Sequence, residues 1–239
     1  VASEMSGNVI DLCPVGALTS KPFRFQARSW EMLKADGIAM HDTVGSNTLI
    51  ETLRNQVKRT LPRANDDINE DWLSDRDRFS YAANDSEDRL LKPMLKINGQ
   101  WKETDWQTAL ENVSTKLLAV VNEYGAGEIG ALASPTATLE EFALLQKLVT
   151  GMGSGNMDYR LRQGDFSGDG AMSAPLLGDS INGLVDSDAV LLIGSNMRKE
   201  QPMLAARLRK AARNGASICA VNNIKYDFAM PMASNIAVS

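Results

Sequence analysis

The stretch Ala189-Val-Leu-Leu-Ile193, followed by a helical pattern over Glu200–Asn214 and by Ser217-Ile-Cys-Ala-Val221, decides the fold. The two short runs, apolar apart from Ser217, predict strands that are buried on both faces, and the helix between them connects them as parallel neighbours. Pro202 in the first turn and Gly215 after the last turn mark the ends of that helix. The order strand, helix, strand predicts an α/β domain with a parallel sheet.

Helical periodicity extends toward the N-terminus as far as about residue 104. The pattern predicts a helix over residues 104–125, a short buried strand over residues 129–133 and a second helix over residues 138–151. Both helices are expected to start at a capping box, in which a Thr side chain and a Gln or Glu side chain bond each other's backbone amides. The two boxes pair Thr104 with Gln107 and Thr138 with Glu141.

Residues 36–103 instead alternate short β-like runs with polar turns. Three strands at hairpin spacing are expected over Ile38–Asp42, Thr48–Leu53 and Gln56–Leu61, and a small hairpin tip over Ile97–Trp101. The strongly polar residues 65–92 are expected to be mostly irregular. The chain therefore divides by pattern into three parts, residues 1–35, 36–103 and 104–239, of which the second is β-rich and the third α/β.

Composition excludes several classes of protein and of site. The chain has 239 residues, a net charge of −5, two cysteines (Cys13 and Cys219) and one histidine, His41. The acidic balance argues against a nucleic-acid binder. No apolar run approaches the roughly 20 residues of a membrane span. Two cysteines and one histidine, far apart in sequence, cannot by themselves form a structural zinc site or an iron–sulfur cluster.

Two glycine-containing loops resemble nucleotide-binding patterns. Gly125-Ala-Gly-Glu-Ile-Gly130 matches G-x-G-x-x-G, but it closes a helix and precedes a strand, so we interpret it as a helix C-cap. Gly194-Ser-Asn-Met-Arg-Lys-Glu-Gln-Pro202 follows a strand and opens a helix, where α/β proteins bind ligands. Its residues leave two interpretations open: a loop whose Arg198 and Lys199 contact phosphate, or an ordinary turn with polar caps.

Three other features have structural interpretations. His41 is expected inside a strand and is interpreted as structural, and Cys219 as a buried apolar residue of a strand. The acidic run Asp66–Asp71 lacks the spaced carboxylates and the glycine of a calcium-binding loop, so it is interpreted as a solvated turn.

Cys13 differs from these because Pro14 and Gly16 follow it. A cysteine thiolate enters an iron–sulfur cluster from a tight turn of this kind, in which Pro ends the local structure and Gly allows close approach of the backbone. Backbone amides of the turn can then bond the sulfur. The pattern makes Cys13 a candidate cluster ligand that needs three further thiolates, which the chain lacks.

These residues carry a resemblance to a known family. The run from Gly7 to Phe25, with Ala27–Glu31, closely resembles the large iron–sulfur subunit (the 75 kDa-type or G subunit) of NADH–quinone oxidoreductase, respiratory complex I, within the molybdopterin oxidoreductase superfamily. The resemblance continues at Asp42–Asn47, Leu61–Glu70, Trp72–Phe79, Tyr159–Gln163 and Gly194–Pro202.

The resemblance implies an internal fragment with a defined layout. Residues 1–35 would be the end of a ferredoxin-like iron–sulfur domain, residues 36–103 a β-rich domain like the [4Fe–4S] domain of molybdopterin oxidoreductases, and residues 104–239 the N-terminal part of a molybdopterin-oxidoreductase-like α/β domain. Cys13 matches the last ligand of a [4Fe–4S] cluster whose other three ligands lie upstream of this chain. The full-length subunit would also hold a [2Fe–2S] and further [4Fe–4S] clusters.

The same resemblance implies that the β-rich domain has lost its own cluster. In molybdopterin oxidoreductases the last ligand lies in a pattern like Leu-Cys-x-Lys-Gly-Arg-Phe, where this chain has Leu73–Phe79 with Ser74 in place of Cys. Residues 28–42, where the other ligands would be, contain no cysteine either. We therefore expect no cluster within residues 36–100. The loop Gly194–Pro202 resembles one that meets the molybdopterin cofactor, but no molybdenum is expected.

The function implied is electron transfer from NADH, through FMN and iron–sulfur clusters, to quinone, coupled to proton translocation. The partners would be other subunits of the complex I peripheral arm, including the FMN- and NADH-binding subunit, at the cytoplasmic face of the bacterial inner membrane. No catalytic residue is expected, and the isolated fragment should be inactive. The alternatives are a molybdopterin-dependent oxidoreductase such as a formate dehydrogenase, which the missing cysteines disfavour, and a non-redox scaffold.

Overall fold

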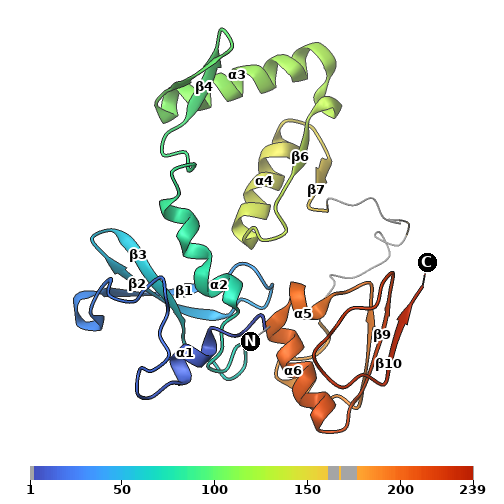
Figure 1. The fold of residues 1–239 in the computed structure, drawn as a ribbon. Coiled ribbons are helices and arrows are strands. Elements are labelled where there is room, and N and C mark those ends of the chain that lie inside the picture. Colours follow the sequence, from blue (N-terminus) through green and yellow to red (C-terminus); the bar gives the residue numbers. More distant parts are fainter. Residues whose placement is uncertain (1–2, 161–166, 168–176, 239) are drawn as a thin grey trace. The chain divides into compact units, whose positions relative to one another are not determined.

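The computed structural model describes residues 3–160, 167 and 177–238, so the end of the Tyr159–Gln163 stretch lies outside the described residues. The chain forms two compact units (Figure 1). The first contains the residues up to Ser86 together with the C-terminal segment that starts before β8 (Ala189–Ile193), and the second contains the residues between them. Mixed α/β structure, with a small antiparallel sheet followed by parallel strands, confirms the predicted fold class.

The antiparallel sheet consists of β1 (Leu33–Ile38), β2 (Asn47–Leu53) and β3 (Gln56–Pro62), in the order β1-β2-β3. The two later strands match the prediction closely. The predicted strand over residues 38–42 is wrong, because β1 ends where that strand was expected to begin and His41 lies in the following loop. Thr43 and Gly45 both take positive φ angles there, which interrupts strand pairing.

The polar residues between 65 and 92 contain more regular structure than expected. A short helix, α2 (Asp75–Phe79), is followed by the 3-10 segment η2 (Ser80–Asp85). Ser74 caps α2 by accepting a hydrogen bond from the Asp77 amide. Two further short elements precede the sheet, α1 (Asn8–Leu12) and η1 (Ser29–Glu31).

The parallel sheet of the first unit joins β8, β9 (Ser217–Asn222) and β10 (Ser234–Ala237) in the order β10-β9-β8. The helix α6 (Pro202–Arg213) connects β8 to β9 and has Pro202 in its first turn, as predicted, although it begins two residues later than expected. Two shorter helical segments complete this part, η4 (Gly183–Asp186) and α5 (Met197–Glu200).

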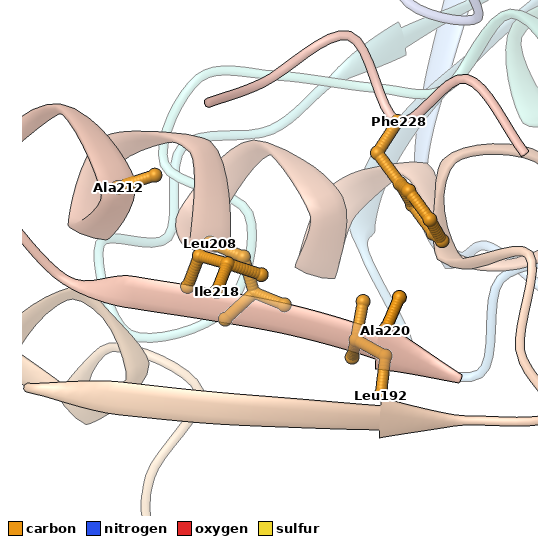
Figure 2. Packing of buried hydrophobic residues seen from close by; sticks show 6 residues of the cluster. All are labelled: Leu192, Leu208, Ala212, Ile218, Ala220 and Phe228. Carbon is orange, nitrogen blue, oxygen red and sulfur yellow. The ribbon is translucent and has the colours of Figure 1, made fainter. Parts of the chain in front are cut away.

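The apolar core of this part lies between α6 and the sheet. Figure 2 shows Leu208 of α6 close to Ile218 of β9, and both side chains are almost fully buried. The core is completed by Leu192, Ala212, Ala220 and Phe228.

Only one face of β8 is covered by the described residues of this unit. Side chains alternate along a strand, so Leu192 faces α6 while Leu191 and Ile193 point to the other face, where they are 57% and 73% exposed. The prediction of burial on both faces is therefore wrong for these residues. Cys219 lies on that second face of β9 and is partly buried, not fully buried as expected.

The second unit begins with a hairpin of β4 (Met94–Ile97) and β5 (Gln100–Glu103), as expected. Its turn residues Asn98 and Gly99 both have positive φ, the conformation that a two-residue hairpin turn requires. The helix α3 (Trp106–Tyr124) follows and contains no buried residue. Its cap is Asp105, whose carboxylate accepts from the Thr108 amide at 2.8 Å, so the predicted capping box at Thr104 is wrong.

Two short parallel strands, β6 (Gly130–Leu132) and β7 (Asn156–Asp158), flank the helix α4 (Leu139–Gly151). The predicted capping box of α4 is confirmed, since Thr138 and Glu141 each bond the other's backbone amide. The loop after α3 contains the 3-10 turn η3 (Ala126–Glu128) and starts at Gly125 with φ 97°, as expected of a helix C-cap. No helix among the described residues is long and apolar enough to cross a membrane.

Candidate functional site

Cys13 lies directly after α1, at the start of a tight turn. The Gly16 amide donates to the Cys13 carbonyl at 3.4 Å, and Gly16 itself has φ 65°, which favours glycine. The turn brings the Leu18 amide to 3.4 Å from the Cys13 Sγ atom, to which it donates a hydrogen bond. The sequence Cys-Pro-x-Gly thus forms a turn that aims backbone amides at a sulfur.

These amides favour the thiolate form of Cys13. The hydrogen bond from Leu18 is the main cause that lowers the pKa of the Cys13 thiol below its ordinary value, and the amides of Val15, Gly16 and Ala17 act in the same direction. Partial burial opposes them but does not cancel them. The thiolate is the form of cysteine that binds metal, so the turn favours the form of Cys13 that a metal ligand would need.

The donor set fits one corner of an iron–sulfur cluster. A thiolate that accepts backbone amide hydrogen bonds, as Cys13 does from Leu18, is the environment in which cluster sulfurs are held and their potential is tuned. Among the described residues, no group of three or more His, Cys, Asp or Glu is arranged to hold a metal ion. Within the described part of the chain, Cys13 is thus a candidate for a single cluster ligand and has no partner ligands grouped around it.

The segment before Cys13 is fixed to the start of α2 by buried polar contacts. The Asn8 side chain, 4% exposed, donates to the Leu73 carbonyl at 2.8 Å and accepts from the Leu73 amide at 3.0 Å. The Asp75 carboxylate accepts from the Gly7 amide at 2.7 Å and from the Ser6 hydroxyl at 2.6 Å. Sequence reasoning missed these contacts, since the partners lie 65 or more positions apart.

Ser74, which the resemblance places at the position of a cluster-ligating Cys, is already hydrogen-bonded within the chain. Its side chain is 1% exposed, its hydroxyl donates to the Asp77 carboxylate at 2.8 Å, and its oxygen accepts from the Asp77 amide at 3.1 Å. A neutral hydroxyl is also a poor iron ligand compared with thiolate. The His41 side chain has no part in this arrangement, while its backbone amide donates to Asp77 at 3.2 Å.

The basic residues of the loop Gly194–Pro202 pair with carboxylates of the chain itself. The Arg198 Nε atom donates to Glu4 at 2.8 Å, and the same guanidinium pairs with Asp227. Lys199 also pairs with Glu4. Of the two interpretations that the sequence left open, these contacts favour a turn whose charges are neutralised internally.

Asp42 is a buried carboxylate that interacts with Asp77 of α2. Asp42 is 2% exposed and its Oδ2 atom has no hydrogen-bond partner among the described residues. Burial is the main cause that raises the pKa of Asp42 to about 6, and the nearby carboxylate of Asp77 adds to the shift. The Val44 amide, 3.4 Å from its Oδ1 atom, partly offsets both effects. Asp42 is thus a buried acid whose charged form is disfavoured.

Three family models match successive parts of the chain. Residues 1–19 match the ferredoxin-like domain of NADH-quinone oxidoreductase subunit 3. Residues 32–82 match the NDSU1/NuoG-like 4Fe-4S domain of NADH-ubiquinone oxidoreductase. Residues 89–234 match the molybdopterin oxidoreductase model.

Relatives of known identity agree with these matches. The chain is 40% identical over 215 residues to the NADH-quinone oxidoreductase G subunit of Rickettsia felis, covering 90% of this chain and 31% of that protein. It is 38% identical over 211 residues to the mitochondrial NADH-ubiquinone oxidoreductase 78 kDa subunit of Candida albicans, covering 88% of this chain and 29% of that protein. These relatives confirm the resemblance inferred from the sequence stretches, and the chain spans about a third of their length.

A solved structure shows the same fold at low sequence identity. Acetylene hydratase from Pelobacter acetylenicus superimposes with a TM-score of 0.50 at 15% identity, covering 82% of this chain and 26% of that chain. At this identity the likeness concerns the fold alone.

Proposed function

Since the chain belongs to the molybdopterin oxidoreductase family, we propose that it is part of the iron–sulfur subunit of an NADH–quinone oxidoreductase. In this role it belongs to the path that carries electrons from NADH, through FMN and iron–sulfur clusters, to quinone, coupled to proton translocation. The observation that carries the proposal is the 40% identity to the Rickettsia felis relative, which extends over 90% of the chain. The isolated chain is expected to be inactive.

Within this role we assign Cys13 as one ligand of a [4Fe–4S] cluster, with three ligands from outside the chain. The cluster, when bound, supplies one-electron transfer. The residues of this chain supply the thiolate, the amides of Val15 to Leu18 that stabilise it, and the anchoring of α1 that places it. No residue is assigned acid–base chemistry. The [2Fe–2S] and other [4Fe–4S] clusters of the subunit would lie outside this chain, and no molybdenum is expected.

Three functional parts follow from this assignment. Residues 1–35 end the ferredoxin-like domain, residues 36–103 form a β-rich domain without a cluster, and residues 104–239 begin the molybdopterin-oxidoreductase-like domain. Their partners are the other subunits of the peripheral arm, including the one that binds FMN and NADH, at the cytoplasmic face of the bacterial membrane. Support comes from the succession of the three family matches along the chain.

The two cysteines provide a matched test in the assembled complex. Cys13→Ala should remove the iron, the sulfide and the reduced-state EPR signal of one [4Fe–4S] cluster, because no other thiol of this chain lies in the turn. Cys219→Ala, on β9, should leave all three unchanged. A Cys13→Ala complex with the full iron content and every EPR signal would contradict the assignment.

The β-rich domain is tested separately with the 239-residue chain. After reconstitution with iron and sulfide, the Cys13→Ala chain should hold no cluster, because Ser74 is engaged with Asp77 and residues 28–42 contain no cysteine. One equivalent of cluster bound by that variant would overturn the expected absence.

A further inference from the structure

The guanidinium of Arg78 spans the last turn of α1. Its side chain is 4% exposed, and its Nη2 atom donates to the Asn8 Oδ1 atom at 2.8 Å and to the Asp11 Oδ2 atom at 2.6 Å. Asn8 and Asp11 are three positions apart, so they lie on one face of the helix. Arg78 therefore bridges consecutive turns of the short helix that ends one residue before Cys13.

The backbone at the start of α1 is shaped to receive this side chain. A Cβ atom at Gly7 would lie 2.6 Å from Arg78 Cδ and 2.8 Å from Asp75 Oδ1, so only glycine fits there without displacing them. The Asp75 amide also donates to the Glu4 carbonyl at 2.8 Å. Residues 4–11 are thus fixed in position against the start of α2. The helix α2 belongs to the β-rich domain.

The Arg78 side chain leaves one of its buried nitrogen atoms without a hydrogen bond in the described part of the chain. Its Nε atom is buried without a hydrogen-bond partner among the described residues, which costs free energy in a folded protein. The ion pair joins Arg78 to Asp11, which lies two positions before Cys13 in the sequence, at the end of the helix that leads into the Cys13 turn. A buried charge is weakly screened by salt and acts over several ångströms.

We propose that Arg78 is a positioning residue for the cluster that Cys13 ligates, and that its ion pair with Asp11 balances the charge beside that cluster. The inference rests on the proposed ligation by Cys13. Reduction adds an electron to the cluster, so a net positive charge nearby raises its midpoint potential and a net negative charge lowers it. The β-rich domain, without a cluster of its own, then tunes the cluster of its neighbour.

Two single charge variants and their double variant, made in the assembled complex, test this proposal. The midpoint potential of the cluster is followed by EPR in each. Arg78→Gln leaves the Asp11 carboxylate unbalanced and should lower the potential. Asp11→Asn leaves the Arg78 cation unbalanced and should raise it. The double variant should return close to the wild-type potential. Arg207→Gln is the matched control, since Arg207 is a 5% exposed arginine paired with Glu70 and has no contact with α1 among its hydrogen bonds.

Loss of the cluster in Arg78→Gln alone, with its retention in Arg78→Lys and in Arg207→Gln, would support the positioning role. In that case Asp11→Asn still decides the electrostatic role, because the Asp11 side chain is 28% exposed and its replacement is tolerable. Shifts of the same sign in the two single variants, or no shift with the cluster present, would overturn the inference. Such a result would leave the assignment of Cys13 as a ligand intact. That assignment is contradicted only if the Cys13→Ala complex retains the cluster.

Discussion

The N-terminal region and the α6 region of the first unit are held together by different kinds of buried group. Residues 3–86 bury only Met32 and Leu73 among apolar residues. Their buried polar residues are Asn8, Asp42, Ser46, Thr48, Glu51, Thr60, Asn69, Ser74, Asp77 and Arg78. Around α6 the buried residues are mainly apolar, such as Leu192, Leu208 and Ile218. The stability of the first region depends on the direction of each hydrogen bond, whereas the stability of the second depends on the volume and shape of its side chains.

The largest expected loss of stability follows from removing side-chain volume in the α6 region. Leu208→Ala should reduce the free energy of unfolding by about 3 kcal/mol, because Leu208 is 2% exposed and truncation leaves a cavity between α6 and β9. Leu208→Met, which keeps the volume, should cost less than about 1.5 kcal/mol. Urea unfolding, with hydrogen exchange of the β9 amides, measures both. Equal losses in the two variants would show that shape and not volume limits this core.

The next largest loss of stability follows from changing the hydrogen bonds of a buried side chain in the N-terminal region. Asn69 is fully buried, accepts from the Asn47 amide at 2.9 Å, and donates to the carbonyls of Arg63, Glu70 and Trp72 at 3.1–3.2 Å. Asn69→Ala should cost about 2 kcal/mol, since these groups lose a buried partner.

Asn69→Asp tests whether direction or volume matters at this position. The variant has the same size, but its carboxylate would face three carbonyl oxygens, so it should be at least as unstable as Asn69→Ala. Trp72 fluorescence reports the unfolding, because its indole donates to Glu70 next to this site. A stable Asn69→Asp variant would contradict the contrast drawn between the two regions.

The smallest effect concerns the pH dependence of the polar region. Because the pKa of Asp42 is raised to about 6 in the fold from an unfolded value near 3.8, the folded state binds more protons between these pH values. Stability should therefore fall as the pH rises from about 4 to 6, and level off above.

Asp42→Asn removes this titration and the repulsion from Asp77. It should flatten that part of the curve and stabilise the chain by about 1 kcal/mol at pH 7. Arg76 also acts on Asp42 and lowers its pKa, so Arg76→Gln should raise that pKa and extend the loss of stability to higher pH. Urea unfolding across pH 4 to 8 measures these changes. An unchanged slope in Asp42→Asn would show that another group causes it.

Much of the secondary structure was predictable because it depends on local patterns. The strand over Ala189–Ile193, the start of α6 at Pro202 and the capping box at Thr138 all follow from nearby residues. The prediction fails where a neighbouring residue competes, as at Asp105, which caps α3 in place of Thr104. The end of β1 was misplaced because positive φ angles at Thr43 and Gly45 stop the strand, and Thr is not a residue that signals them.

The sequence by itself determined the fold class and the family resemblance, and it made Cys13 the candidate cluster ligand, because these depend on residue identity, spacing and periodicity. The tertiary structure decided how Cys13 is held. Asn8, Asp75 and Arg78 form one network although Asn8 and Arg78 are 70 positions apart. The pattern of a polar residue does not reveal its partner, since direction and distance arise only when the chain folds. For that reason a stretch that looked irregular contains the helix that anchors the candidate cluster ligand.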